Sequence, residues 1–76
     1  MTNFRNLKIA INDQQPLDDV VRELYRLGYT EEYRTNYIPQ SIKVLDCGVF
    51  QTLSIPLYEH TSLWSEATTL AALKEM

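Results

Sequence analysis

The chain has 76 residues, of which 45% are hydrophobic, and carries a net charge of −3. This length predicts a single domain over residues 1–76, and the apolar content suffices for a small core and argues against intrinsic disorder. The acidic balance disfavours binding to nucleic acid or to a membrane surface, because both depend on clustered Lys and Arg.

A lone cysteine, Cys47, can form neither an internal disulfide nor a cysteine-rich zinc site. Such cysteine usage is typical of a reduced, cytoplasmic protein. The first residues lack the apolar core of a signal peptide, and no stretch approaches the ~20 apolar residues of a membrane-spanning helix. We therefore expect a cytoplasmic protein that is not associated with a membrane.

Two consecutive segments predict a strand followed by a helix. Residues 6–12 alternate, with Leu7, Ile9 and Ile11 on one side, as in a half-buried strand. Residues 16–28 have apolar side chains at helical spacing along one stripe: Leu17, Val20, Val21, Leu24 and Leu27. The other side carries charges spaced for three ion pairs: Asp18–Arg22, Asp19–Arg22 and Glu23–Arg26. We expect the stripe to pack on the apolar side of the strand.

The residues around this helix indicate where it begins and ends. Pro16 suits the first turn, and Asp13 or Gln15 is the candidate N-cap, with Asp the better one chemically. Gly28 suits the left-handed residue that ends a helix, after which Tyr29 would fold back onto the helix.

Residues 29–40 are rich in tyrosine and predict a loop with one helical turn around Glu31–Arg34. Tyr37 and Ile38 are candidates to begin a strand. Pro39 would confine such a strand to a sheet edge, because proline cannot donate a hydrogen bond to a neighbouring strand.

Residues 41–55 predict a β-hairpin. Its turn is expected at residues 46–48, because Gly48 can adopt a positive φ at no steric cost. In the return strand, the polar Gln51 and the apolar Phe50 blur the distinction between the two faces, so the register stays open.

The C-terminal segment allows two interpretations. One is a single helix. The other is a short strand around residues 63–67, followed by a helix that Thr68 or Thr69 caps and that Leu70 and Leu73 anchor. The adjacent threonines favour the second interpretation, because β-branched residues resist a helix interior and hydroxyls suit a cap.

The expected order is therefore β-α-β-β-(β)-α. We predict a two-layer α+β domain in which a small antiparallel sheet of three or four strands packs against one amphipathic helix, with a short C-terminal helix. The order of the strands in the sheet stays open.

Tyrosines recur every four residues from Tyr25 to Tyr37, with arginines between them. Tyr and Arg are enriched in interface hot spots, so these residues are the candidate partner-binding site: Arg26, Tyr29, Tyr33, Arg34 and Tyr37. The same residues would suit a nucleotide held between tyrosines and an arginine. The competing interpretation is that the tyrosines only pack a loop onto a small core.

No arrangement of residues indicates catalysis, a cofactor or a metal. His60 has no evident metal-binding partners. Cys47 could act as a nucleophile with His60, but no helix N-terminus is placed to activate Cys47, so an enzyme of this kind is the least favoured alternative. Asp18, Asp19 and Glu23 suit a solvated helix face, because the arginines beside them account for their charges. The common enzyme signatures do not occur, so we expect a protein that is not an enzyme.

A pattern of three parts extends over most of the chain: Ile9 before a helix ending in Leu27-Gly28-Tyr29, then a hairpin, then Thr68-Thr69-Leu70 near the last residue. In this respect the chain resembles small accessory proteins encoded by tailed bacteriophages. The resemblance implies a compact binding protein in the cytoplasm of an infected bacterium, where it acts on a host enzyme or defence system. It implies no catalytic residue.

We therefore predict a non-enzymatic protein-binding module, to which the resemblance adds the inhibition or modulation of a host protein. The alternative is a small-ligand binding protein of the nucleotide class. An exposed strand edge would also allow two copies to pair as a homo-oligomer.

Overall fold

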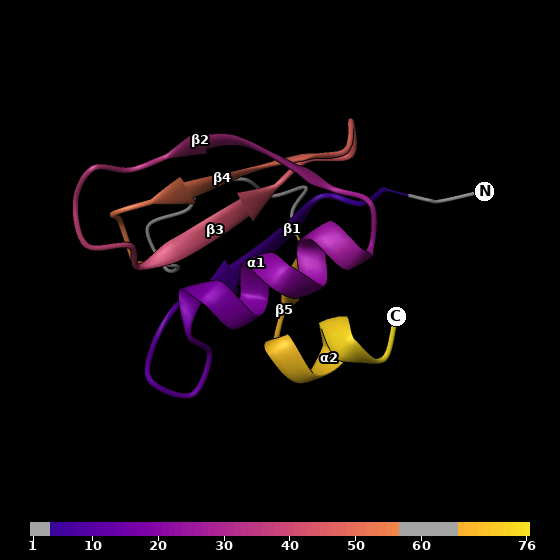
Figure 1. The fold of residues 1–76 in the computed structure, drawn as a ribbon, viewed down its shortest axis with the longest axis horizontal. Helices are drawn as coiled ribbons and strands as arrows, with labels where there is room; N and C mark the ends of the chain where they lie inside the picture. The colour runs from indigo at the N-terminus through magenta and orange to yellow at the C-terminus, as the bar shows by residue number, and fades with distance from the viewer. Residues whose placement is uncertain (1–3, 57–65) are drawn as a thin grey trace.

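Two helices cover one face of a five-stranded sheet in the computed structural model of the protein, which describes residues 4–56 and 66–76 (Figure 1). In chain order the elements are β1 (Leu7–Ala10), α1 (Leu17–Arg26), β2 (Thr30–Arg34), β3 (Ser41–Val44), β4 (Val49–Leu53), β5 (Glu66–Thr68) and α2 (Leu70–Lys74). The strands lie in the order β2-β4-β3-β1-β5. This confirms the predicted α+β domain in which a sheet packs against an amphipathic helix.

The sheet is mixed, whereas an antiparallel sheet was expected. β3 pairs antiparallel with β1 and β4, but the edge strands β2 and β5 pair parallel with β4 and β1. The described residues thus form five strands, and only the central three match the expected antiparallel arrangement. The parallel pairs join positions far apart in the sequence, such as Thr30 with Val49 and Leu7 with Glu66. No local sequence pattern therefore indicates these pairings.

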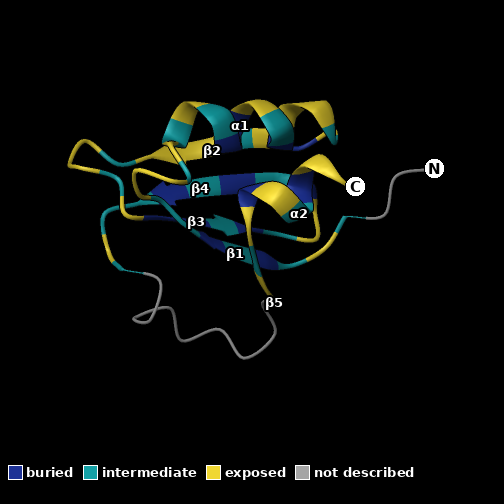
Figure 2. Cartoon of the chain, turned by 90° about the horizontal axis from the view of Figure 1, so that it is seen from below, coloured by how far each residue is buried: buried dark blue, intermediate teal, exposed yellow. Residues whose placement is uncertain are grey.

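The core lies between the sheet and the two helices (Figure 2). Alternate residues of the three central strands are fully buried on this face: Leu7, Ile9, Ile42, Val44 and Phe50. The helices contribute five buried residues: Val20, Val21, Leu24, Leu70 and Leu73. Removing each such side chain from water contributes roughly 1.5–3 kcal/mol, so the three buried residues of the predicted apolar stripe of α1 contribute substantially to stability.

α1 begins at Leu17 without a side-chain cap. Pro16 occupies the N-cap position and makes no capping hydrogen bond, so the predicted cap at Asp13 or Gln15 is wrong. The amide of Gln15 is engaged in the preceding turn instead, where Nε2 donates to the Ala10 carbonyl at 2.7 Å. Two acidic residues in the first turn interact favourably with the positive, N-terminal end of the helix dipole and so stabilise the helix.

α1 ends in a Schellman motif, as Gly28 predicts. Gly28 has a φ of 99°, and its N–H donates to the Tyr25 carbonyl at 3.0 Å. The N–H of Tyr29 donates to the Leu24 carbonyl, also at 3.0 Å. These bonds satisfy two carbonyls at the helix end and turn the chain back toward the sheet.

The interpretation of residues 29–40 is largely wrong. Thr30–Arg34 is the strand β2, with no helical turn, and residues 37–38 lie in a connection where a strand was considered. The charged side chains of β2 give no apolar alternation, so the segment does not look like a strand locally. It is held by its parallel ladder with β4, which a bulge interrupts between Glu31 and Tyr33.

The hairpin of β3 and β4 is confirmed, and its register pairs Val44 with Phe50. Phe50 therefore faces the core. Gly48 closes the turn with a φ of 92°, and its N–H donates to the Leu45 carbonyl at 3.1 Å. The positive φ would strain any other residue here, and a Cβ at this position would lie 3.0 Å from Cε2 of Phe4, so the ring would have to shift.

The C-terminal segment is a strand followed by a helix, and the single-helix interpretation is wrong. Glu66–Thr68 is β5, and Thr69 is the N-cap of α2, where its Oγ1 accepts a hydrogen bond from the Ala72 N–H at 3.1 Å. Both leucines of α2 are buried, as expected. Residues 63–65 of the predicted strand lie outside the described residues.

Candidate protein-interaction site

Exposed apolar side chains lie at one end of the sheet. In residues 4–56 and 66–76, six large apolar side chains are exposed: Tyr25, Tyr33, Tyr37, Ile38, Ile55 and Met76. Four of these lie in or shortly after β2 and β4. Because these two strands run parallel, their C-terminal ends lie at the same end of the sheet. We call Tyr33, Tyr37, Ile38 and Ile55 the apolar end. Its most exposed members are the neighbours Tyr37, at 79%, and Ile38, at 81%.

The exposure of this pair follows from the strand order. β4 lies between β2 and β3, so the connection from β2 to β3 must cross the C-terminal end of β4 (Figure 1). Backbone hydrogen bonds fasten the connection to β4 on both sides. The Thr35 N–H donates to the Thr52 carbonyl at 3.0 Å, and the Gln40 N–H donates to the Leu53 carbonyl at 2.9 Å. The residues between these anchors are held away from the core.

Side chains also fix the shape of this connection. The N–H of Tyr37 donates to Thr35 Oγ1 at 3.2 Å, and Gln40 Nε2 donates to the Ser54 carbonyl at 2.8 Å. The second bond holds the loop against the chain just before Ile55. A loop ordered in advance loses less conformational entropy when a partner binds it.

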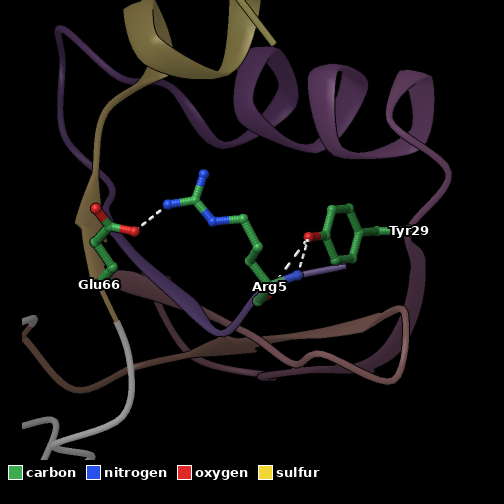
Figure 3. Close-up of polar contacts among 3 residues, drawn as sticks. All are labelled: Arg5, Tyr29 and Glu66. Carbon is green, nitrogen blue, oxygen red and sulfur yellow. Dashed lines mark hydrogen bonds and ion pairs between the residues drawn. The ribbon is translucent and has the colours of Figure 1, made fainter. Parts of the chain in front are cut away.

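Tyr29, a predicted site residue, belongs to the core. Its side chain is 4% exposed, and its ring packs edge-on against Phe4 with the centroids 4.8 Å apart. Its hydroxyl accepts a hydrogen bond from the Arg5 N–H at 2.9 Å, while the Arg5 guanidinium pairs with Glu66 on β5 (Figure 3). Tyr29 therefore anchors the residues before β1 and is not accessible to a partner.

Arg26, also a predicted site residue, is bonded to α2. Its Nη2 donates to the Leu73 carbonyl at 2.8 Å, and its Nη1 approaches the Met76 carbonyl at 3.5 Å. Its Nε pairs with Glu23 at 2.7 Å, which is the one predicted α1 ion pair that the described residues form. The guanidinium thus joins the C-terminal ends of the two helices.

Tyr33 and Arg34 are neighbours on β2 but project to opposite faces of the sheet. Tyr33 lies beside Gln51 in the ladder and Arg34 beside Thr52. Arg34 Nε donates to Glu31 Oε2 at 2.9 Å. The expected grouping of tyrosines with arginines is therefore not formed. Of the predicted site residues, Tyr29 is buried, whereas Arg26, Tyr33, Arg34 and Tyr37 are exposed.

Two members of the apolar end, Ile38 and Ile55, are not among the residues predicted from the sequence. The available signal is the dipeptide Ile-Pro, which occurs at Ile38-Pro39 and at Ile55-Pro56. Proline ends the regular pairing of a strand and keeps the preceding residue extended. A large apolar residue before such a stop is placed outside the sheet and its core.

Other candidate chemistry has little support in the described residues. Cys47 is exposed in the hairpin turn, and His60 lies outside the described part of the chain. No group of three or more His, Cys, Asp or Glu side chains in residues 4–56 and 66–76 is arranged to hold a metal ion. Within the same ranges, neither helix has the length and hydrophobicity needed to cross a lipid bilayer.

Comparison with known proteins gives no match among protein-family models, curated proteins or solved structures. The class of the protein is therefore defined by its own structure, as a small α+β domain with an exposed apolar end.

Proposed function

We propose that the protein is a non-enzymatic binding module that docks on another protein through the apolar end. The observation that carries this proposal is the exposure of Tyr37 and Ile38 on a loop fastened at both sides. A flexible loop would let two such side chains fold back onto nearby apolar surface. Here the anchors hold both of them in water.

Docking of this loop would bury two large apolar side chains. Complete burial of a side chain of this size contributes roughly 1.5–3 kcal/mol, and tyrosine is among the residues most often found in interface hot spots. Tyr33 and Ile55 would extend the contact beyond the loop. A side-chain contact of this kind suits a pocket or groove on the partner.

The outer edge of β2 offers less support for docking by strand addition. β2 carries Glu31, Glu32 and Arg34, and a bulge interrupts its ladder with β4. Charged side chains and bulges are the features by which natural sheets discourage edge-to-edge pairing. Pairing of two copies through this edge stays a prediction, which light scattering at rising protein concentration will test.

We further propose that the partner is a protein of a bacterial host, since the chain resembles accessory proteins of tailed phages. The module would then act by covering a functional surface of an enzyme or defence protein. The nucleotide alternative has less support, because Tyr29 is buried and the guanidinium groups of Arg26 and Arg34 are held by nearby carboxylates.

Affinity capture from a bacterial lysate tests the docking proposal. The wild-type protein is compared with a Tyr37→Ser/Ile38→Ser variant and with Met76→Ser, which alters an exposed apolar residue on another part of the surface. Exposed substitutions change stability by about 0.5 kcal/mol or less, so all three proteins should fold.

We expect a stoichiometric protein to bind the wild type and Met76→Ser, with recovery reduced about tenfold or more for the double variant, as loss of a hot spot implies. Equal recovery by the double variant would contradict the proposed site. Recovery of no stoichiometric protein from any host tested would contradict the function.

A further inference from the structure

Two lysines face each other on the sheet surface opposite the helices. Lys8 and Lys43 are direct partners in the antiparallel ladder of β1 and β3. The residues on either side of each lysine are buried under the helices, so both lysines project to the other face, where both are partly exposed. Their Cβ atoms are therefore about 4.5–5.5 Å apart, as for any directly opposed pair.

The ladders continue this pair into a row across the whole sheet. Lys43 lies opposite Gln51 on β4, which lies opposite Tyr33 on β2, while Lys8 lies opposite Ala67 on β5. In order, the row reads Tyr33, Gln51, Lys43, Lys8 and Ala67.

Neither lysine is neutralised by the part of the chain that the structure describes. The three ion pairs of residues 4–56 and 66–76 involve only arginines. Glu32, which is not part of the row, is bonded to one of its members: its Oε1 accepts a hydrogen bond from Gln51 Nε2 at 2.7 Å, on the β2 side of the lysines. Glu66, next to Ala67, is paired with Arg5.

Like charges placed directly opposite each other destabilise a sheet. The chain has three lysines, and two of them form this pair although the net charge of the chain is −3. We propose that the Lys8–Lys43 pair is a binding site for a phosphate group carried by a small molecule. Two ammonium groups supply charge-assisted donors to the oxygens of a dianion, and the bound charge relieves their mutual repulsion.

This site is distinct from the apolar end, and its test does not depend on a protein partner. The probe is inorganic phosphate, added to the full chain at constant ionic strength and followed by the backbone amide shifts of β1 and β3. Lys43→Gln and Lys8→Gln remove one cation each, and Lys74→Gln is the matched control, since Lys74 lies in the last turn of α2.

We expect saturable shifts in β1 and β3, affinity reduced about tenfold by Lys43→Gln or Lys8→Gln, and unchanged affinity in Lys74→Gln. Shifts that rise linearly with phosphate, or an equal loss of affinity in Lys74→Gln, would overturn the site.

Thermal unfolding without phosphate supplies a second readout. In dilute buffer, Lys43→Gln should raise Tm by about 1–4 °C, because one of two repelling charges is removed. The difference should vanish in high salt, which screens the repulsion. A lower Tm for Lys43→Gln would mean that the lysines stabilise the fold, and would overturn the proposal.

Discussion

One threonine of the core carries a buried hydroxyl group whose capacity for hydrogen bonding is not used. Thr52 is fully buried on the helix-facing side of β4, and its Oγ1 has no hydrogen-bond partner in residues 4–56 and 66–76. A buried hydroxyl without a partner costs roughly 1–3 kcal/mol relative to its state in water. The shape of the threonine side chain fits the core, but its hydroxyl group makes no favourable contribution to stability.

Replacement of this hydroxyl by a methyl group should stabilise the protein. We expect Thr52→Val to raise the free energy of unfolding by about 1 kcal/mol, since valine has nearly the same shape and no unsatisfied oxygen. Urea unfolding measures the change, with Thr30→Val on the exposed edge strand as the control, for which about 0.5 kcal/mol or less is expected. A loss of stability in Thr52→Val would show that the hydroxyl has a partner.

At the scale of elements, α2 depends on two polar side chains for its position. It has only five residues, too few for a stable helix on its own. Gln15 Oε1 accepts a hydrogen bond from the Leu70 N–H at 3.0 Å, and Arg26 Nη2 donates to the Leu73 carbonyl at 2.8 Å. The turn before α1 therefore holds the start of α2, and the last turn of α1 holds its end.

Removal of the arginine clasp should loosen α2 without unfolding the sheet. We expect Arg26→Gln to cost about 1 kcal/mol, because bonds from a charged group to partly exposed carbonyls are lost. Amide hydrogen exchange of Leu73 should quicken about fivefold. Arg22→Gln is the matched control, because Arg22 forms no ion pair within the described residues. Equal exchange in the two variants would contradict the clasp.

At the scale of the whole molecule, the sequence predicts those structural features that depend on interactions between residues close together in the chain. The stripe from Leu17 to Leu27, the positive φ of Gly28 and the threonine cap of α2 all arise within a few residues of chain. The edge strand β2 could not be predicted in this way, because Thr30 pairs with Val49 and the strand has no apolar alternation. The position of Tyr29 in the core depends on the same pairing.

The candidate site was predicted in part for the same reason. The tyrosine spacing predicts Tyr33 and Tyr37 as site residues, but the exposed loop exists because β4 is inserted between β2 and β3. Arg34 points away from Tyr33 because consecutive residues of a strand project to opposite faces of the sheet. Strand order is a long-range property, and it decides which members of a sequence cluster share a surface.

Site-specific photocrosslinking in living cells tests most directly whether the protein docks through its apolar end. A photoreactive phenylalanine analogue replaces Tyr37 in one protein and Arg22, on the outer side of α1, in another. We predict a crosslinked adduct with a single bacterial protein from position 37 and none from position 22. Adducts from position 22 alone, or equal adducts from both positions, would contradict the proposed interface.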